Sequence, residues 1–217
     1  MALCRPVVAL TAAAPAPEAA PTGNGDWAEA DPGSNLRFVG AGTSLRRLLR
    51  PDVAAMQRRA AGRALDVRGP LASGFAYDSV RELVVAPPSS LADRDEAPFD
   101  TVCSFGALAA APRLEPFVAT LLALTASDGR LLFVEPDGDA DRWRRRFDRV
   151  GRRMWGMALS RNITGALWAG GFEVTSLDRR PVCHGPPWLL RVVVGAARRD
   201  PHRLGGPAAL GAAGTAP

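Results

Sequence analysis

The sequence contains no lysine, and this absence weakens any inference from its charge. All 27 basic residues are arginine, against 22 acidic residues, which leaves a net charge of +5. Arginine in place of lysine, together with abundant alanine, glycine and proline, indicates a GC-rich coding bias, so the high pI says little about partners. The charge favours an ordinary basic protein, and binding of RNA or DNA through arginine stays an alternative.

Cysteine and histidine are also scarce, which argues against two kinds of site. Cys4, Cys103 and Cys183 are too few and too far apart for a disulfide framework or a zinc site, so we expect a reduced, cytoplasmic protein. The two histidines, His184 and His202, do not stand at ligand spacing. No metal is therefore expected.

Long apolar runs are missing as well. No stretch reaches the length of a transmembrane helix, so the sequence predicts no membrane partner. The first residues faintly resemble a signal peptide, but prolines and Glu18 interrupt the apolar run. Composition predicts a disordered Ala/Pro-rich leader over 1–34, one domain over 35–197 and a flexible tail over 198–217.

The stretch from Pro98 to Pro136 shows how that domain is built. Residues 99–105 open with an acid, Asp100, and then continue mainly apolar, as in a strand covered on both faces, and 113–126 carry a helical apolar stripe. Residues 127–129, Ser-Asp-Gly, break the helix, and 131–134 form a second buried strand. Two strands joined by one helix must be parallel and connected in the right-handed sense. The functional site is therefore expected at the carboxyl ends of these strands.

Earlier strands fit the same plan. Residues 35–40 predict a strand that runs into a glycine turn and then a helical face, in which Pro51 allows a kink or two short helices. Residues 64–67 predict a second strand carrying Asp66, roughly 22 residues beyond Ser44, and 82–86 a third.

The last third of the sequence predicts two helices and two strands at one edge of the sheet. Residues 140–159 predict a helix with one buried stripe, formed by Trp143, Phe147, Val150, Met154 and Met157. Arginines fill most of its remaining surface, as a solvated face or as a surface for an anionic partner. After a short helix over 162–169, strands over 172–177 and 188–195 form an antiparallel edge hairpin. The predicted class is α/β: a three-layer, Rossmann-like, mostly parallel sheet with helices on both faces and this C-terminal hairpin.

The order of these parts resembles the class I S-adenosylmethionine-dependent methyltransferases, especially compact ones that act on small molecules. The resemblance is best in FDTVCS followed by LLALTASDGRLLFVEP, where the family commonly has FD-hydrophobic-V, a leucine-rich helix, a Pro-Gly-Gly turn and LLFVEP. NITGALWAGGFEVTSLDR resembles the later helix, AGF and strand. The resemblance implies methyl transfer from S-adenosylmethionine to a small-molecule acceptor that the sequence does not identify.

The same resemblance assigns cofactor contacts by position. VGAGTS, residues 39–44, corresponds to the glycine-rich first motif, whose glycines let the cofactor approach the backbone. Asp66 corresponds to the acid that ends the second strand and accepts the ribose hydroxyls. The implied cofactor-binding residues are Gly40, Ala41, Gly42, Ser44, Asp66, Ser104 and Phe105. No catalytic residue is assigned, although His184, Glu135 or Tyr77 could take a proton from the acceptor.

Departures from the family pattern motivate an alternative. Phe38 and Ser44 replace an acid and a glycine of the first motif, and Ala86 or Pro87 replaces the acid near adenine. A methyltransferase-fold protein that acts as a binding or assembly partner is therefore the second hypothesis. An NAD-linked enzyme is disfavoured, because Leu45 stands where a dinucleotide site prefers glycine.

Overall fold

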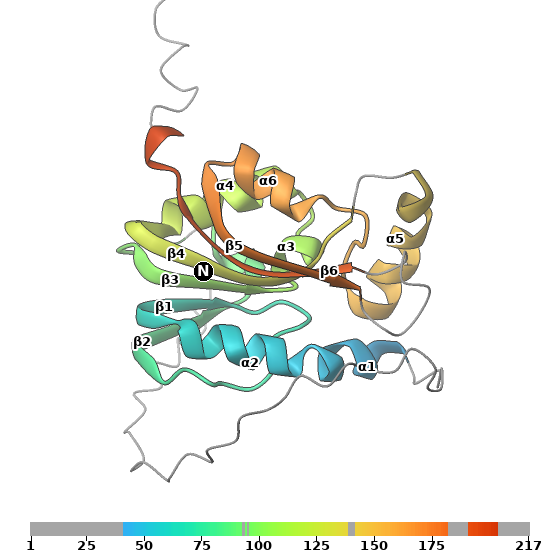
Figure 1. The fold of residues 1–217 in the computed structure, drawn as a ribbon, viewed down its shortest axis with the longest axis horizontal. Coiled ribbons are helices and arrows are strands. Elements are labelled where there is room, and N and C mark those ends of the chain that lie inside the picture. The colour runs from blue at the N-terminus through green and yellow to red at the C-terminus, as the bar shows by residue number, and fades with distance from the viewer. Residues whose placement is uncertain (1–40, 93, 95, 139–141, 182–190, 204–217) are drawn as a thin grey trace, which may run out of the picture.

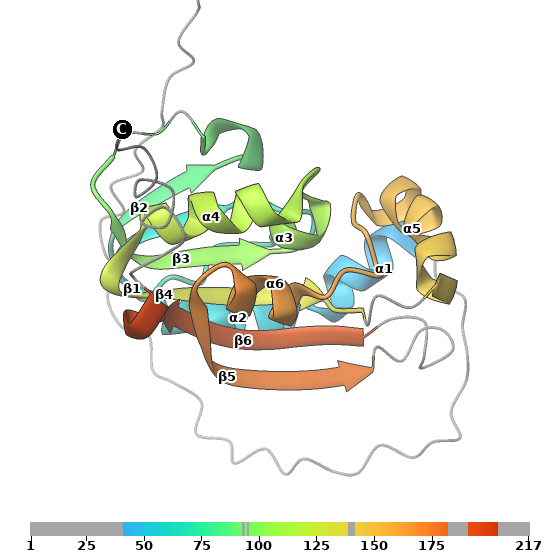
Figure 2. The ribbon, with the colours of Figure 1, turned by 90° about the horizontal axis from the view of Figure 1, so that it is seen from above.

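A computed structural model describes residues 41–92, 94, 96–138, 142–181 and 191–203 of the chain. Six strands form one sheet in the order β2-β1-β3-β4-β6-β5, parallel from β2 to β4 and antiparallel beyond β4 (Figures 1 and 2). The strands are β1 (Ala61–Val67), β2 (Ser79–Ala86), β3 (Phe99–Phe105), β4 (Thr125–Pro136), β5 (Phe172–Pro181) and β6 (Arg191–Arg199). The predicted α/β class and the antiparallel hairpin are confirmed.

The unit from β3 to β4 also agrees with the prediction in its main parts. The helices α3 (Ala107–Ala110) and α4 (Leu114–Leu124) connect the two parallel strands. The predicted break over 127–129 is wrong, because β4 already begins at Thr125 and runs through these residues with a shift in its pairing to β3. Gly129 makes that close pairing possible, since a Cβ there would lie 2.9 Å from the Phe99 carbonyl oxygen.

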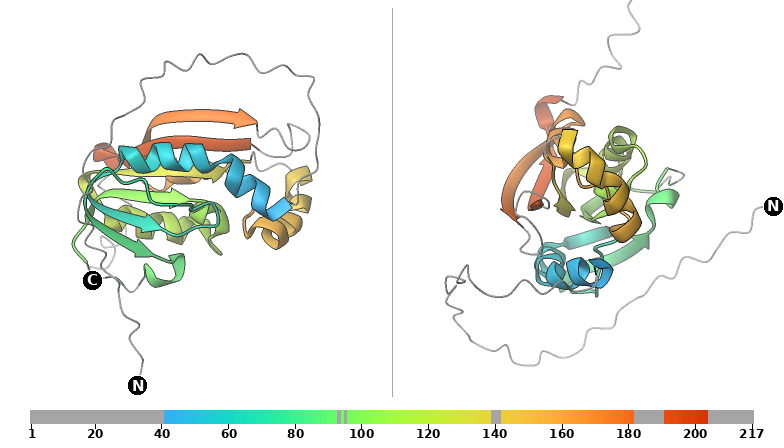
Figure 3. Two further views of the ribbon diagram at one scale, coloured as in Figure 1. Left: turned by 90° about the horizontal axis from the view of Figure 1, so that it is seen from below. Right: turned by 90° about the vertical axis from the view of Figure 1, so that its right-hand side faces the viewer.

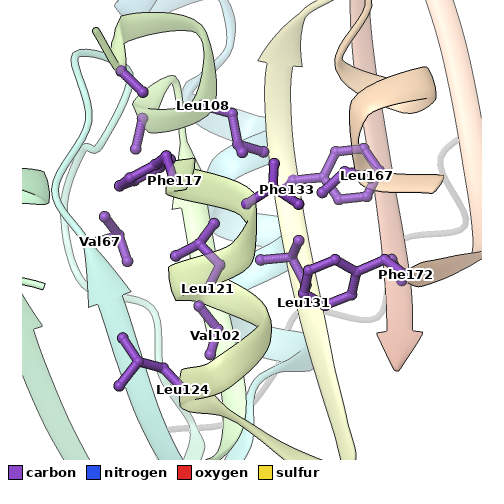
Figure 4. Close-up of a cluster of buried hydrophobic side chains, with 14 of the residues drawn as sticks. Val67, Val102, Leu108, Phe117, Leu121, Leu124, Leu131, Phe133, Leu167 and Phe172 are labelled. Atoms are coloured by element: carbon purple, nitrogen blue, oxygen red, sulfur yellow. The ribbon is translucent and has the colours of Figure 1, made fainter. Parts of the chain in front are cut away.

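Two apolar cores lie on opposite faces of the sheet. On one face, α4 and α6 (Ile163–Ala169) pack against β1, β3 and β4, with Phe117, Leu121 and Leu167 among the buried side chains (Figure 4). On the other face, α1 (Ala41–Leu48) and α2 (Arg50–Arg59) contribute Leu45 and Val53 to the second core (Figure 1). The predicted three-layer arrangement is therefore present.

Local signals explain the helix boundaries on these faces. Pro51 stands in the first turn of α2 and separates it from α1, so the chain forms the two short helices that the sequence allowed. Asn162 caps α6 by accepting a hydrogen bond from the Gly165 N–H at 2.7 Å. No helix in the described ranges is both long and apolar enough to cross a bilayer.

The helix α5 (Arg142–Trp155) departs from its prediction. Met157, just beyond it, is buried as expected, but Val150 is 46% exposed and Met154 is 42% exposed. The side chains of Trp143 and Phe147 lie outside the description. The predicted single buried stripe is therefore wrong in its described part: α5 projects beyond the sheet (Figure 2), and the side that meets the domain carries Asp148 and Gly151.

Candidate functional site

The strand order defines where a ligand is expected. From β1 the chain passes to β2 on one side, and it then crosses back to β3 on the other side. In open α/β sheets the crevice forms where the order reverses, beyond the carboxyl ends of the two central strands. Here that switch point lies between β1 and β3. The segments that border it are 68–78, after β1, and 106–113, after β3.

This order revises the place of Asp66. The sequence reading put Asp66 at the end of the second strand, with a first strand over 35–40, but 35–40 lie outside the described residues. In the structure Asp66 stands near the end of β1, the strand that borders the switch point, directly opposite Cys103 of β3. Asp66 is thus brought to the crevice itself.

Asp66 is fully buried, and neither of its carboxylate oxygens has a hydrogen bond in the described part of the chain. Arg68 approaches with its Nε 3.8 Å from Oδ2, a long ion pair. The Tyr77 hydroxyl lies near the carboxylate and also lacks a hydrogen bond of ordinary geometry. Burial raises the pKa of Asp66, and Tyr77 and Arg68 oppose that effect. With only the long Arg68 ion pair and the nearby Tyr77 hydroxyl beside it, the buried Asp66 carboxylate is under-satisfied, which is costly and rare in folded proteins.

The segment 68–78 forms a cover over Asp66. Gln57, fully buried on α2, binds it twice: its Nε2 donates to the Gly74 carbonyl at 3.3 Å, and its Oε1 accepts from the Ala76 N–H at 3.1 Å. The Arg68 guanidinium lies 4.2 Å from the centre of the Phe75 ring, which is mostly exposed. We call residues 68–78 the cover loop.

The cover loop also packs across the carboxyl ends of the paired strands β1 and β3. The Leu71 N–H donates to the Phe105 carbonyl at 3.1 Å, and Leu71 is buried. A Cβ on Gly106 would lie 2.8 Å from the Met157 sulfur and 3.0 Å from Leu71 Cγ. A Cβ on Gly69 would meet the backbone of residues 105–107. The crevice is therefore closed by protein atoms in this conformation.

The end of β3 holds Ser104 and Phe105, which the resemblance assigned to the cofactor. The Ser104 hydroxyl donates instead to Glu135 Oε1 at 2.7 Å, on the face opposite Asp66. Phe105 is fully buried in the core under α1 and α2. Both residues adjoin the switch point, but their side chains serve the fold.

Glu135 anchors the next segment. Its carboxylate also accepts from the N–H groups of Leu108 and Ala109, at 3.1 and 3.0 Å, and so holds the first turn of α3. Burial raises the pKa of Glu135 to about 7, although its hydrogen bonds act in the opposite direction. With all its described contacts internal, Glu135 is a structural acid, which leaves little reason to give it the proton-accepting role.

The predicted glycine motif lies only partly within the described residues. Gly40 is outside them, whereas Ala41, Gly42 and Ser44 form the first turn of α1 rather than a turn between strand and helix. Leu45 and Leu49, buried one turn apart, hold this segment helical. The start of α1 lies at the same edge as the strand ends (Figure 2), but its relation to a ligand stays a prediction.

Sequence reasoning missed the cover loop as part of the site. The signal in the sequence was an acid near the end of a strand, in Leu65-Asp66-Val67, followed by glycines at 69 and 74. The glycine-rich motif was instead assigned to residues 39–44. At the end of β2, Ala86 and Pro87 offer no side-chain acceptor. Asp66 is thus the one described carboxylate that faces the closed crevice without a hydrogen bond.

Other candidates do not converge on this point. His184 and Cys183 lie outside the described residues, and no group of three acidic, histidine or cysteine side chains in the described part could hold a metal ion. A groove of about 570 Å³ runs between the start of α4 and α6, and its lining includes Arg113, Glu115 and Arg161. That groove lies on the other face of the sheet from Asp66.

Comparisons with known proteins bear on the fold. No protein-family model matches the sequence, and no curated protein matches it at a significant level. Solved structures do match: the N-methyltransferase NodS from Bradyrhizobium japonicum WM9 has a TM-score of 0.50 and 12% identity, over 72% of this chain and 97% of that one. NodS in complex with S-adenosyl-L-homocysteine gives 0.50 and 12%, over 75% and 100%. A Burkholderia thailandensis 1,6-didemethyltoxoflavin-N1-methyltransferase gives 0.45 and 20%, over 73% and 82%. At these identities the two NodS matches show likeness of fold alone, and that fold agrees with the Rossmann-like architecture expected from the sequence.

Proposed function

We propose that this chain, which has the fold of the class I S-adenosylmethionine-dependent methyltransferases, transfers a methyl group from S-adenosylmethionine to a small-molecule acceptor. The observation that carries the proposal is the buried carboxylate of Asp66 at the switch point, where neither oxygen has a hydrogen bond. S-adenosylmethionine carries an ammonium group and ribose hydroxyls, which are donors of the kind that this carboxylate lacks. In that respect the residues fit the cofactor.

When bound, S-adenosylmethionine supplies a methyl group already activated by its sulfonium, so transfer needs alignment and a dry pocket more than a strong base. Asp66 would hold the donor groups of the cofactor from the carboxyl end of β1. The cover loop would have to swing away to admit a ligand and could then exclude water from it. The loop is held by the two Gln57 hydrogen bonds, by backbone hydrogen bonds from Leu71 to Phe105 and from Arg68 to Ala86, by the Arg68–Asp66 ion pair and by the buried side chains of Leu71 and Ala72, and opening would have to break these contacts.

Calorimetric titration with S-adenosylmethionine and S-adenosylhomocysteine tests this proposal. The unmodified chain should bind both, and Asp66→Asn should weaken binding at least tenfold, since one charged acceptor is lost. Asp128→Asn, at an exposed position on β4, removes the same charge far from the crevice and should leave binding unchanged. No heat from the unmodified chain at millimolar cofactor would remove the enzyme reading.

A second function is favoured by the closed crevice. Leu71 and Met157 are each only 1% exposed and meet over Gly106, and the end of β2 carries no carboxylate. These features suit a member of the fold that keeps the scaffold as a binding or assembly partner. Leu71→Ala separates the two functions: it should strengthen cofactor binding if the side chain merely gates the site, and it should create no binding if the site has been lost.

A further inference from the structure

The outward side of α5 is both basic and apolar. Its described arginines, Arg149, Arg152 and Arg153, are exposed, and Val150 and Met154 are 46% and 42% exposed beside them. Val150 and Met154 lie one turn apart and so share one stripe along the helix. Large aliphatic side chains exposed together on one helix indicate a surface that something else covers.

The opposite side of α5 is fixed to the domain. The Asp148 carboxylate accepts from the N–H groups of Leu159 and Ser160 at 2.7 and 2.9 Å, and from the Ser160 hydroxyl at 2.6 Å. A Cβ on Gly151 would lie 2.7 Å from Leu159 Cγ, so the helix is pressed closely onto this segment. Asp148 is the only acid among the 14 residues of α5, which include seven arginines. Within α5 itself, no second acid offsets the arginines.

The neighbouring helix extends this surface. Helix α1 contacts α5 in the fold, and its last turn exposes Arg46, Arg47 and Leu48, the last with 39% of its surface accessible. Seen toward the carboxyl ends of the strands, α5 crosses in front of the sheet and α1 lies beside it (Figure 3, right). We call Arg46–Leu48 together with the exposed residues of 149–154 the α1–α5 surface.

We propose that the α1–α5 surface lies on anionic lipid bilayers, with α5 in the plane of the headgroups. Helices that bind in this way combine arginine with exposed apolar side chains, and their affinity has an electrostatic and an apolar part. Nucleic acid would use the arginines, but Val150, Met154 and Leu48 would gain nothing from phosphate groups. The sequence predicted no membrane partner because no segment can span a bilayer, but a helix lying on the surface needs no such segment.

Co-sedimentation of the full chain with vesicles tests the proposal. Vesicles of phosphatidylcholine and phosphatidylglycerol in equal parts should retain the chain at low salt, and vesicles of phosphatidylcholine alone should retain at least tenfold less. The combined variant Arg149→Gln, Arg152→Gln and Arg153→Gln should lower binding to the mixed vesicles at least tenfold. Equal retention by both kinds of vesicle would overturn the proposal.

Two further variants separate insertion from simple charge attraction. The first, Val150→Ser with Met154→Ser, keeps every charge and should still lower binding severalfold, with circular dichroism confirming an unchanged fold. The second is a charge-matched control that removes three exposed arginines elsewhere: Arg58→Gln, Arg81→Gln and Arg130→Gln.

The control variant should bind nearly as well as the unmodified chain. A control that loses as much binding as the Arg149, Arg152 and Arg153 variant would overturn the proposal, because net charge alone would then explain the attraction. Unchanged binding of the serine variant would equally overturn it. So would a chain that ignores the mixed vesicles and instead binds duplex DNA, or that dimerises through this surface in analytical ultracentrifugation. Cofactor binding is not part of the readout, so the result stands apart from the proposed methyl transfer.

Discussion

Two buried acids stand near the carboxyl ends of β1 and β4, the strands on either side of β3, and they differ in their hydrogen bonding. Glu135, at the end of β4, accepts three hydrogen bonds from Ser104, Leu108 and Ala109. Asp66, at the end of β1, accepts none. Both lie at the edge where this fold places its chemistry. The comparison teaches that burial alone does not mark an acid as a candidate site residue, and that Asp66 differs from Glu135 in having only a long ion pair with Arg68 in place of hydrogen bonds.

Removing Glu135 should have the largest effect. Glu135→Ala would leave the Ser104 hydroxyl and the N–H groups of Leu108 and Ala109 without an acceptor in the core, at a cost of about 4 kcal/mol in the free energy of unfolding. Urea titration followed by tryptophan fluorescence measures this loss. Asp66→Ala removes a long ion pair with Arg68 but no hydrogen bond, so it should cost far less, and equal losses would contradict the distinction between the two acids.

The raised pKa of Glu135 should make the stability of the fold depend on pH. The pKa of Glu135 is about 7 in the folded chain against an ordinary 4.5, so the folded chain keeps this proton over a range in which the unfolded chain has released it. The resulting stabilisation is complete below the ordinary value and is lost as the pH rises through about 7, a change of roughly 3 kcal/mol. Urea titrations across this range should show the unmodified chain losing stability relative to Glu135→Gln. Parallel pH curves for the two proteins would contradict the assignment.

Gly106 tests how tightly the crevice is closed. Its φ is +78°, and a Cβ would press on Met157 and Leu71, so Gly106→Ala should cost roughly 2–3 kcal/mol. Gly74→Ala is the matched control, because Gly74 has a φ of +65° but no atom within 4 Å of the added Cβ. That variant should cost only about 1 kcal/mol, from the backbone alone. Thermal unfolding of both variants measures the difference. Equal losses of stability would mean that Leu71 and Met157 move aside at little cost.

Asp66→Asn should have the smallest effect on stability, and of the opposite sign. Replacing an unsatisfied buried carboxylate with a neutral amide of the same shape should raise the free energy of unfolding by roughly 1 kcal/mol. Differential scanning calorimetry without ligand checks this gain. A destabilised variant would show that the contacts of Asp66 with Arg68 and Tyr77 stabilise the fold by more than burial of the carboxylate costs.

The sequence predicted those parts of the fold whose evidence is local. The strand over 99–105, the helical stripe that became α4 and the two strands of the hairpin, one alternating and one more apolar, each have a local pattern, and the structure contains all of them within its described residues. The strand through Ser127–Gly129 was missed, because these polar residues look like a turn and become a strand only by pairing with β3. Pairing depends on residues distant in the sequence.

The site was harder to predict for the same reason. Asp66 was identified as a candidate, but its place beside β3 follows from the order of strands, which no local pattern encodes. The cover loop combines Gly69 and Leu71 with contacts to Gln57 and Phe105, and these are all tertiary. The exposure of Val150 and Met154 likewise depends on which side of α5 meets the domain.

Cys103 gives the closed crevice a built-in chemical reporter. Its thiol is free, fully buried and opposite Asp66, and burial raises its pKa, so a thiol reagent cannot reach it and finds no thiolate to attack. The rate of alkylation at Cys103, measured by peptide mass spectrometry, therefore reports how often this part of the structure opens, as when the cover loop moves away. A ligand that props the loop open would hasten labelling, and one that seals beneath it would stop labelling altogether.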